Sequence, residues 1–301
     1  MAGCSGMAML DAGQVQLTRE IKPFNFFVLG DWGRKGGLSQ TDIANQMIIQ
    51  SNIFKPNFII TVGDNFYEDG VESVNDNHWD SSFNNIYKGL TSKYNWYVSL
   101  GNHDYRGKPE AEMAYHKINK HWILPDRYYT KVFQTADHQK VRFLFIDTDP
   151  FVTDYYSDSR MPEIKLQDTA AQRKWIIKTL SESKEEWKIV VGHHPVYSSS
   201  AKKGNTIELV KMLAPILEQY GVQAYICGHN HDMQHNHPQK GNVDYFVSGA
   251  GSEEKETGAF VNTLFSKNIG GFTDVSISSN TMTVSFVDKN GNTIYQYSRA
   301  K

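Results

Sequence analysis

The chain has 301 residues, of which 40% are hydrophobic and 21% are charged, enough to build one large globular domain or two small ones. Its 31 basic and 33 acidic residues nearly balance, which gives no electrostatic case for binding nucleic acid or an anionic membrane. No apolar run approaches the roughly 20 residues that a transmembrane helix needs. With only two cysteines, Cys4 and Cys227, a disulfide framework is excluded.

Residues 1–22 lack a convincing periodicity, so we expect a flexible leader followed by a single domain over residues 23–301. The first four residues, Met-Ala-Gly-Cys, are similar to the end of a bacterial lipoprotein signal whose upstream part is missing. An arbitrary start of the sequence explains them equally well. The lipoprotein interpretation predicts a secreted or periplasmic protein that is anchored by a lipid on Cys4.

From Phe24 onward, short apolar strands alternate with helical patterns, which predicts a layered α/β fold. The predicted strands are rich in β-branched and aromatic residues and cover 26–29, 58–62, 96–100, 141–147, 188–191, 223–227 and 245–247. The predicted helices cover 41–53, 110–119, 169–181 and 207–219. After Gly271 the pattern becomes antiparallel over 272–277, 282–287 and 293–297, with a hairpin turn at 289–291. No linker rich in Pro, Gly or Ser separates these parts, so they predict one domain with two sheets.

Five of the predicted parallel strands end alike, with an apolar run, a glycine and then a side chain able to bind metal. The five endings are Gly30-Asp31, Gly63-Asp64, Gly101-Asn102-His103, Gly192-His193-His194 and Gly228-His229-Asn230-His231. Because parallel strands bring their carboxyl ends to one edge of a sheet, we expect these side chains to converge there. Carboxylates buried together repel and need a cationic centre. Seven or more oxygen and nitrogen ligands suit two ions about 3.5–4 Å apart that share a bridging carboxylate.

Each of these residues also has an ordinary explanation when it is taken alone. Asp31 could cap a helix, Asn102 could belong to a turn, and each histidine could be a core or capping residue. Tyr67, three residues after Asp64, would usually be a packed aromatic. The joint occurrence of five such endings in one chain is what favours a metal centre.

These blocks resemble, in order, those of the purple acid phosphatases within the calcineurin-like metallophosphoesterases. The similarity is closest to the small, tartrate-resistant animal-type enzymes and runs from about Phe24 to the C-terminus. It implies an αββα sandwich, two mixed β-sheets flanked by helices in the metallophosphoesterase fold. Tyr67 selects the subfamily, because plain metallophosphoesterases usually lack a tyrosine at this position. The matching blocks are Gly30-Asp31-Trp32-Gly33, Gly63-Asp64-Asn65-Phe66-Tyr67, Gly101-Asn102-His103-Asp104, Val190-Val191-Gly192-His193 and Gly228-His229-Asn230-His231.

The resemblance implies an acid phosphatase that hydrolyses small-molecule phosphate monoesters with a binuclear Fe(III)–M(II) centre and a metal-bound hydroxide nucleophile. The divalent ion would be iron, zinc or manganese. His103 would be the catalytic residue that contacts phosphate or assists the leaving group. The ferric ion would be held by Asp31, Asp64, Tyr67 and His231, and the divalent ion by Asp64, Asn102, His193 and His229, with Asp64 as the bridge.

One position departs from the animal-type pattern. Those relatives have a second outer histidine where this chain has Lys202. Lys202, His194 or His103 would then replace the usual leaving-group acid, although a solvated lysine loop is the better explanation of Lys202 itself. We therefore expect substrate contacts from Asn102, His103, His194 and Lys202.

Two alternatives stay open. One is a phosphodiesterase or nucleotidase that uses the same centre, and the other is a non-catalytic scaffold of this fold. The substrate mouth could be shaped by several residues that are more simply packed aromatics or surface loop, namely His78, Trp79, Tyr155, Tyr156 and residues 253–265.

Overall fold

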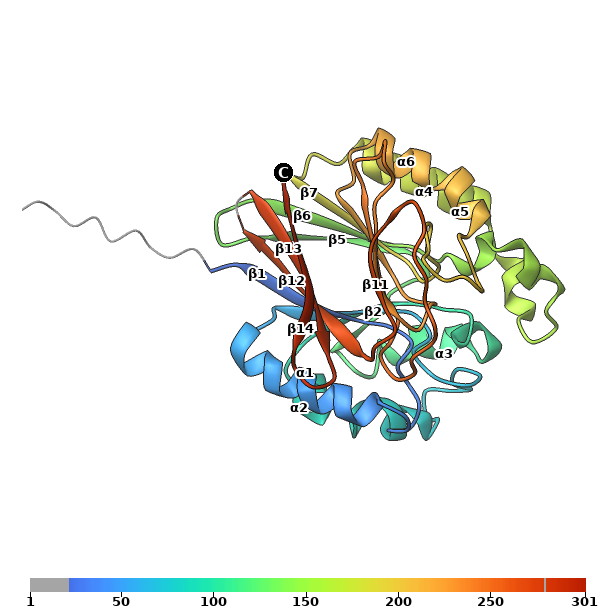
Figure 1. Cartoon of the computed structure of the whole chain (residues 1–301). Coiled ribbons are helices and arrows are strands. Elements are labelled where there is room, and N and C mark those ends of the chain that lie inside the picture. The colour runs from blue at the N-terminus through green and yellow to red at the C-terminus, as the bar shows by residue number, and fades with distance from the viewer. Residues whose placement is uncertain (1–21, 279) are drawn as a thin grey trace, which may run out of the picture.

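A computed structural model describes residues 22–278 and 280–301 of the chain (Figure 1). Two seven-stranded mixed sheets pack face to face, and helices cover the outer face of each. The predicted αββα sandwich is therefore confirmed. Within the described residues, no helix is both long enough and apolar enough to cross a membrane. Cys4 and the predicted leader, except for Lys22, lie outside the described residues.

Sheet A is built from both ends of the chain. It contains β1 (Phe24–Leu29), β2 (Phe58–Val62), β3 (Trp96–Ser99), β4 (Trp122–Ile123), β12 (Gly271–Ser278), β13 (Thr281–Asp288) and β14 (Thr293–Ala300). The strands lie in the order β14-β13-β12-β1-β2-β3-β4. The block from β1 to β4 is parallel, and the last three strands are added antiparallel beside β1.

Sheet B is built from the middle of the chain. It contains β5 (Tyr129–Gln134), β6 (Lys140–Phe145), β7 (Trp187–Val191), β8 (Ala224–Cys227), β9 (Met233–Asn236), β10 (Asp244–Ser248) and β11 (Thr263–Lys267). The strands lie in the order β11-β9-β10-β8-β7-β6-β5, and β6, β7, β8 and β10 form its parallel part. Both sheets thus bring parallel carboxyl ends to an edge, as the sequence predicted.

In the part of the chain that the structure describes, six α-helices and five 3₁₀ or π-helical turns connect the strands. The predicted helix over 207–219 is divided at Leu213, two residues before Pro215, because proline lacks the N–H of an uninterrupted helix and its ring clashes with the preceding turn. The helices are α1 (Gln40–Phe54), α2 (Lys88–Thr91), α3 (Pro109–Tyr115), α4 (Thr169–Ser181), α5 (Ile207–Met212) and α6 (Ala214–Gln219). The shorter turns are the π-helical η1 (Trp79–Asn84) and the 3₁₀ turns η2 (Asp104–Arg106), η3 (Asp149–Phe151), η4 (Thr153–Ser157) and η5 (Pro162–Leu166).

Strand alternation produces three apolar layers. In β1, Phe26 and Val28 belong to the layer between the sheets, whereas Phe27 and Leu29 belong to the layer between sheet A and the helices α1 to α3. The third layer, between sheet B and the helices α4 to α6, is mostly aliphatic. The central parallel strands β1, β2, β3, β8 and β10 are therefore buried on both faces, which explains their nearly continuous apolar sequences.

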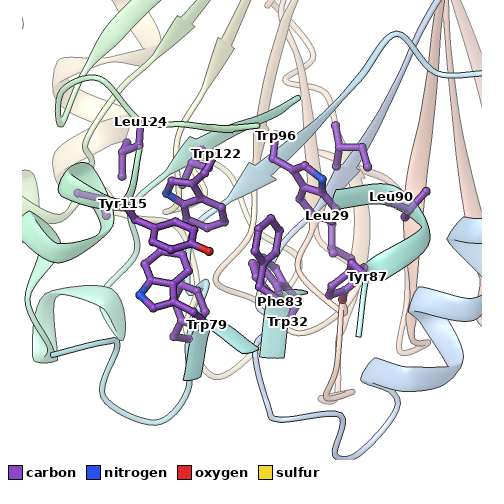
Figure 2. Packing of buried hydrophobic residues seen from close by; sticks show 14 of the residues in the cluster. Leu29, Trp32, Trp79, Phe83, Tyr87, Leu90, Trp96, Tyr115, Trp122 and Leu124 are labelled. Carbon is purple, nitrogen blue, oxygen red and sulfur yellow. The ribbon is translucent and has the colours of Figure 1, made fainter. Parts of the chain in front are cut away.

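The layer beneath sheet A is dominated by aromatic rings, several of them from the segment between β2 and β3 (Figure 2). Trp79 stacks on Tyr115 with ring centroids 3.6 Å apart and meets Trp122 edge-on at 5.1 Å. Trp79 is 2% exposed, so it is a packed aromatic of the core and does not shape the substrate mouth. Trp32 and Phe66 join the same cluster at 5.5 Å from each other. Because Trp32 follows Asp31 and Phe66 precedes Tyr67, ring packing fixes the backbone on which those side chains stand.

Candidate metal centre

The structure brings all seven predicted metal ligands together at the edge where the carboxyl ends of both sheets meet. Six of them are buried, and His229 is partly exposed. Their metal binding remains a prediction, but their convergence is a property of the fold. Sheet A provides Asp31 after β1, Asp64 and Tyr67 after β2 and Asn102 after β3, and sheet B provides His193 after β7 and His229 and His231 after β8.

Three of these residues have left-handed backbone conformations, with φ of 59° at Asp31, 50° at Asp64 and 70° at His229. Such conformations cost free energy for residues other than glycine and persist where the surrounding structure enforces them, often at functional sites. Gly63, at φ 90°, allows the turn before Asp64. A β-carbon on Gly63 would lie 2.6 Å from His193 Nδ1, so this position requires glycine.

The first group of donor atoms surrounds the hydroxyl of Tyr67. Tyr67 Oη lies 3.0 Å from Asp31 Oδ1, 2.8 Å from Asp64 Oδ2 and 3.1 Å from His231 Nε2. Asp31 Oδ1 and His231 Nε2 are themselves 3.4 Å apart. Two carboxylates, a phenol and an imidazole thus point at one small volume. This set, here called the tyrosine set, consists of Asp31, Asp64, Tyr67 and His231.

The second group of donor atoms surrounds His193 Nε2. This atom lies 3.4 Å from Asp64 Oδ1, 3.3 Å from Asn102 Oδ1 and 3.2 Å from His229 Nδ1. The other ring nitrogen, His193 Nδ1, lies 2.9 Å from the Val62 carbonyl oxygen and donates to it. That bond turns Nε2 toward the centre, as is usual for metal-binding histidines. This set, here called the histidine set, consists of Asp64, Asn102, His193 and His229.

Both sets fit a cation. Asp64 belongs to each through a different oxygen, Oδ2 toward Tyr67 and Oδ1 toward His193, which is the arrangement of a bridging carboxylate. The tyrosine set is rich in hard oxygen donors, which suit a trivalent ion. The histidine set, with two imidazoles and an amide, suits a borderline divalent ion. The donor chemistry therefore fits two unlike metal ions that share Asp64.

Charges within the site act strongly on one another. Burial and the carboxylates of Asp31 and Asp64 raise the pKa of Tyr67 well above its ordinary value. Burial opposes ionisation of Asp64, but the charges of His193 and His103 outweigh it and hold the Asp64 pKa well below its usual range. Burial likewise opposes protonation of His193, yet Asp64 prevails and raises the His193 pKa to about 9. Asp64 therefore remains ionised and attracts positive charge to its surroundings.

His103 lies beside the two sets and belongs to neither of them. Its ring centroid is 4.3 Å from that of Tyr67, and its Nε2 is 3.9 Å from Asp64 Oδ2. Its backbone N–H donates to Asp64 Oδ1 at 2.8 Å. Burial lowers the pKa of His103 although Asp64 acts against this. The position of His103 at the side of the bridge is compatible with the predicted contact to phosphate.

His194 lies behind His229, with ring centroids 4.4 Å apart. Its Nδ1 is 2.9 Å from Thr148 Oγ1, and its Nε2 is 2.8 Å from the Tyr155 hydroxyl. Both ring nitrogens therefore have hydroxyl partners. His194 thereby supports the wall next to His229, and Tyr155 forms part of that wall.

A cavity of about 640 Å³ opens between η4 and α5 and reaches His229. Its wall includes Tyr155, His194 and Lys203. The Lys203 ammonium donates to the His229 carbonyl oxygen at 2.6 Å, whereas Lys202 faces a smaller hollow beside His231. Lys203, one residue beyond the predicted Lys202, is thus the lysine in contact with a candidate metal ligand.

Other residues at the centre were not expected from the sequence. Asp104 accepts hydrogen bonds from the backbone N–H groups of Asn65 and Gly101, both at 2.8 Å, and so joins the loops that carry Asp64 and Asn102. Asp104 belongs to the block Gly101-Asn102-His103-Asp104, and its place directly after His103 is the sequence signal that could have indicated a role at the centre. Arg34 lies over the ring of Tyr67, and its partner Glu253 follows β10. No local pattern connects these two residues.

The chain is similar to several known proteins. Residues 24–233 match the calcineurin-like phosphoesterase family. The chain is similar to purple acid phosphatase 7 of Arabidopsis thaliana, with 38% identity over 76% of this chain and 70% of that protein. It is similar to tartrate-resistant acid phosphatase type 5 of Homo sapiens, with 33% identity over 90% of this chain and 89% of that protein. Among solved structures it is similar to GAP50, the anchor in the inner membrane complex of Plasmodium, with 25% identity, a TM-score of 0.79 and coverage of 92% of this chain and 89% of that chain.

Proposed function

Because the chain belongs to the purple acid phosphatases of the calcineurin-like phosphoesterase family, and is thus a phosphatase with a dimetal centre, we propose that it hydrolyses phosphate monoesters with Fe(III) and a divalent ion. The observation that carries the proposal is the pair of donor sets that share Asp64. The ferric ion would lie in the tyrosine set. The divalent ion, iron, zinc or manganese, would lie in the histidine set.

When bound, two such cations neutralise the charge of a phosphate ester and acidify water. The chain's own residues supply the geometry. Asp31 Oδ2 accepts the backbone N–H of His229 at 2.9 Å, which leaves Oδ1 directed at Tyr67 and joins the two sets. His103 would contact the phosphate from the side of Asp64. The leaving group would extend into the cavity walled by Tyr155 and His194, where the Lys203 ammonium would attract the anionic phosphate.

We also propose that residues 23–301 act as one domain. Sheet A takes strands from both ends of the described chain, and β12 pairs with β1 along its length, which supports this arrangement.

The test combines metal analysis with a visible absorption spectrum of the freshly purified protein. We expect one iron and one further metal per chain and a phenolate-to-ferric band in the visible region. Tyr67→Phe should lose the band while keeping part of its turnover. Tyr87→Phe is the matched control, since its ring is buried in the aromatic layer away from the ligands. An oxidised, iron-loaded wild-type protein without colour would contradict the ferric assignment.

Two further outcomes correspond to the alternatives. Turnover of bis(4-nitrophenyl) phosphate above that of 4-nitrophenyl phosphate would favour a phosphodiesterase. Absence of bound metal after supplying iron and zinc would favour a non-catalytic scaffold. We do not expect the scaffold, because the seven candidate donor residues converge, and we do not expect the phosphodiesterase, because the similar proteins are named acid phosphatases.

A further inference from the structure

Two charged residues outside the donor sets contact only the tyrosine set. The Arg34 guanidinium lies over the Tyr67 ring with its central carbon 3.8 Å from the ring centroid. Glu253 Oε2 lies 2.9 Å from His231 Nδ1, a buried nitrogen with no hydrogen-bond partner of good geometry among the described residues. The same carboxylate oxygen lies 2.8 Å from Arg34. Arg34 and Glu253 therefore touch one another and one candidate ligand each.

The position of Arg34 is held from several sides. Its guanidinium forms ion pairs with Glu68 at 2.5 Å and with Glu253, and its Nε donates to Ser252 Oγ at 3.2 Å. Ser252 in turn donates to the Asp31 carbonyl oxygen at 2.5 Å. The Arg34 side chain is only 13% exposed. A guanidinium held in this way presents a fixed positive charge to the face of an aromatic ring, where it interacts favourably.

Glu253 is placed to act on His231. A negative charge beside the outer nitrogen of a metal-binding imidazole raises the basicity of the ring. Lys255 lies 3.1 Å from the same oxygen and adds a second positive neighbour. Among the described residues the histidine set has no such pair of opposite charges: His193 Nδ1 donates to the neutral Val62 carbonyl, and the Lys203 ammonium contacts only the His229 backbone carbonyl. The two sets thus differ in the groups behind them as well as in their donors.

We propose that Arg34 and Glu253 are positioning residues that set the electron-donor strength of Tyr67 and His231, and thereby the reduction potential of the metal in the tyrosine set. The proposal rests on the proposed function, since it requires a redox-active ion there. Glu253 makes His231 a stronger donor and favours the ferric state. Arg34 withdraws negative charge from the Tyr67 ring and favours the ferrous state. The two residues therefore act in opposite directions on the same ion.

The experiment measures the one-electron reduction potential of the iron-loaded protein and its visible absorption band. The intensity of the band is divided by the amount of bound iron. Glu253→Gln should raise the potential and move the band to longer wavelength, because a weaker imidazole donor leaves the ferric ion a better electron acceptor. Arg34→Met should lower the potential. For a tenfold change in the preference for Fe(III) over Fe(II), each shift would be about 59 mV.

Matched controls separate a local effect from a general loss of charge. Glu254→Gln removes the same charge one residue along, where the carboxylate pairs with Lys289, and should leave potential and band unchanged. Arg34→Lys keeps the charge and should fall between Arg34→Met and the wild type. Arg142→Met removes an arginine paired with Glu185 far from the centre and should have no effect.

Failures of the two proposals are distinguishable. A wild-type protein that binds iron but has no visible band defeats the proposed ferric centre. The wild-type protein could have the band while the Glu253→Gln and Arg34→Met variants keep the same band and potential. That result would overturn only the inference about these two residues. Shifts of equal sign in the two variants would also overturn it, because opposite effects are its central claim.

Discussion

Sheets A and B contribute opposite chemistry to the centre. Every oxygen donor of the two sets, from Asp31, Asp64, Tyr67 and Asn102, follows a strand of sheet A, whereas every imidazole of the two sets follows a strand of sheet B. Neither sheet alone can assemble either donor set. The centre is therefore a property of the packing between the sheets, and a bound metal would report directly on that packing.

The two sheets also fix their ligand loops by different means. In sheet A, aromatic packing holds the segments beside Asp31 and Tyr67, since Trp32 (Figure 2) and Phe66 belong to the same buried cluster. The loop after β7 in sheet B is held by hydroxyl groups. Thr148 Oγ1 accepts the backbone N–H groups of His193 at 3.2 Å and His194 at 3.0 Å, and Tyr225 donates to the His194 carbonyl at 2.7 Å. Aromatic burial thus adds to the Asp104 hydrogen bonds in sheet A, whereas hydroxyl groups hold the loop after β7 in sheet B.

The largest expected effect comes from the one ligand shared by both donor sets. Asp64→Asn should abolish turnover and reduce metal content to background, because a neutral amide cannot bridge two cations. Asp42→Asn, at an exposed position on α1, is the control and should keep both properties. Turnover of 4-nitrophenyl phosphate and metal analysis are the measurements. A variant that keeps activity and both metals would contradict the role of Asp64 as bridge.

The difference in how the loops are held can be tested by unfolding in denaturant. Trp32→Ala should lower the free energy of unfolding by about 3–5 kcal/mol, since it empties part of a buried aromatic cluster. Thr148→Val should cost about 1–3 kcal/mol, because it leaves buried N–H groups without an acceptor. Equal losses would show that the loops do not differ in this way.

Two buried strand carboxylates, Asp274 in sheet A and Asp244 in sheet B, have pKa values shifted in opposite directions. On β12 of sheet A, burial raises the Asp274 pKa to about 7, although Gln50 donates to it at 2.7 Å. On β10 of sheet B, burial acts against ionisation of Asp244, but His235 and Arg299 outweigh it and lower the Asp244 pKa. A raised carboxyl pKa means that the folded state holds the proton more tightly than the unfolded state. Asp274 should therefore reduce stability as pH rises from about 4 to about 7.

The measurement is the free energy of unfolding between pH 4 and pH 8. In the wild type, ionisation of Asp274 should lower the free energy of unfolding by up to about 4 kcal/mol as pH rises, estimated from about 1.4 kcal/mol per pKa unit. Asp274→Asn should remove this pH dependence. Asp244→Asn should have the opposite sign, losing stability at neutral pH. A wild-type protein and an Asp274→Asn variant with parallel pH profiles would contradict the prediction for sheet A.

The smallest expected effect concerns two adjacent lysines at the sheet B side of the centre. Lys203→Ala should lower kcat/KM by about tenfold, as expected for removing a charged contact worth about 1.5 kcal/mol. Lys202→Ala is the control and should change kcat/KM little. A larger loss of kcat/KM in Lys202→Ala than in Lys203→Ala would show that Lys202, as expected from the sequence, is the lysine that contacts the substrate.

Much of the site could be predicted because its information is local. A glycine and a ligand directly after an apolar strand mark each position, and parallel strands bring such positions to one edge. Strands β4, β5, β9 and β11 were missed because they are very short or carry polar residues where an apolar run was sought. The contact of Arg34 with Glu253 could not be predicted, since it joins loops of different sheets. Lys203 was missed because the path of loop 198–204 decides which of two neighbouring lysines reaches His229.

The order of the strands along the chain has a consequence for biosynthesis. All oxygen donors of the two sets precede residue 103, whereas the last of their imidazoles belongs to His231. At about 5–20 residues per second, translation would take on the order of ten seconds to pass from Asn102 to His231. Until His193 is made, the nascent chain carries Asp31 and Asp64 without any imidazole of the two sets, and sheet A lacks the strands β12 to β14 throughout the interval. With the proposed ligands, loading of both ions would come late in synthesis, and a chain truncated before β8 would lack His229 and His231.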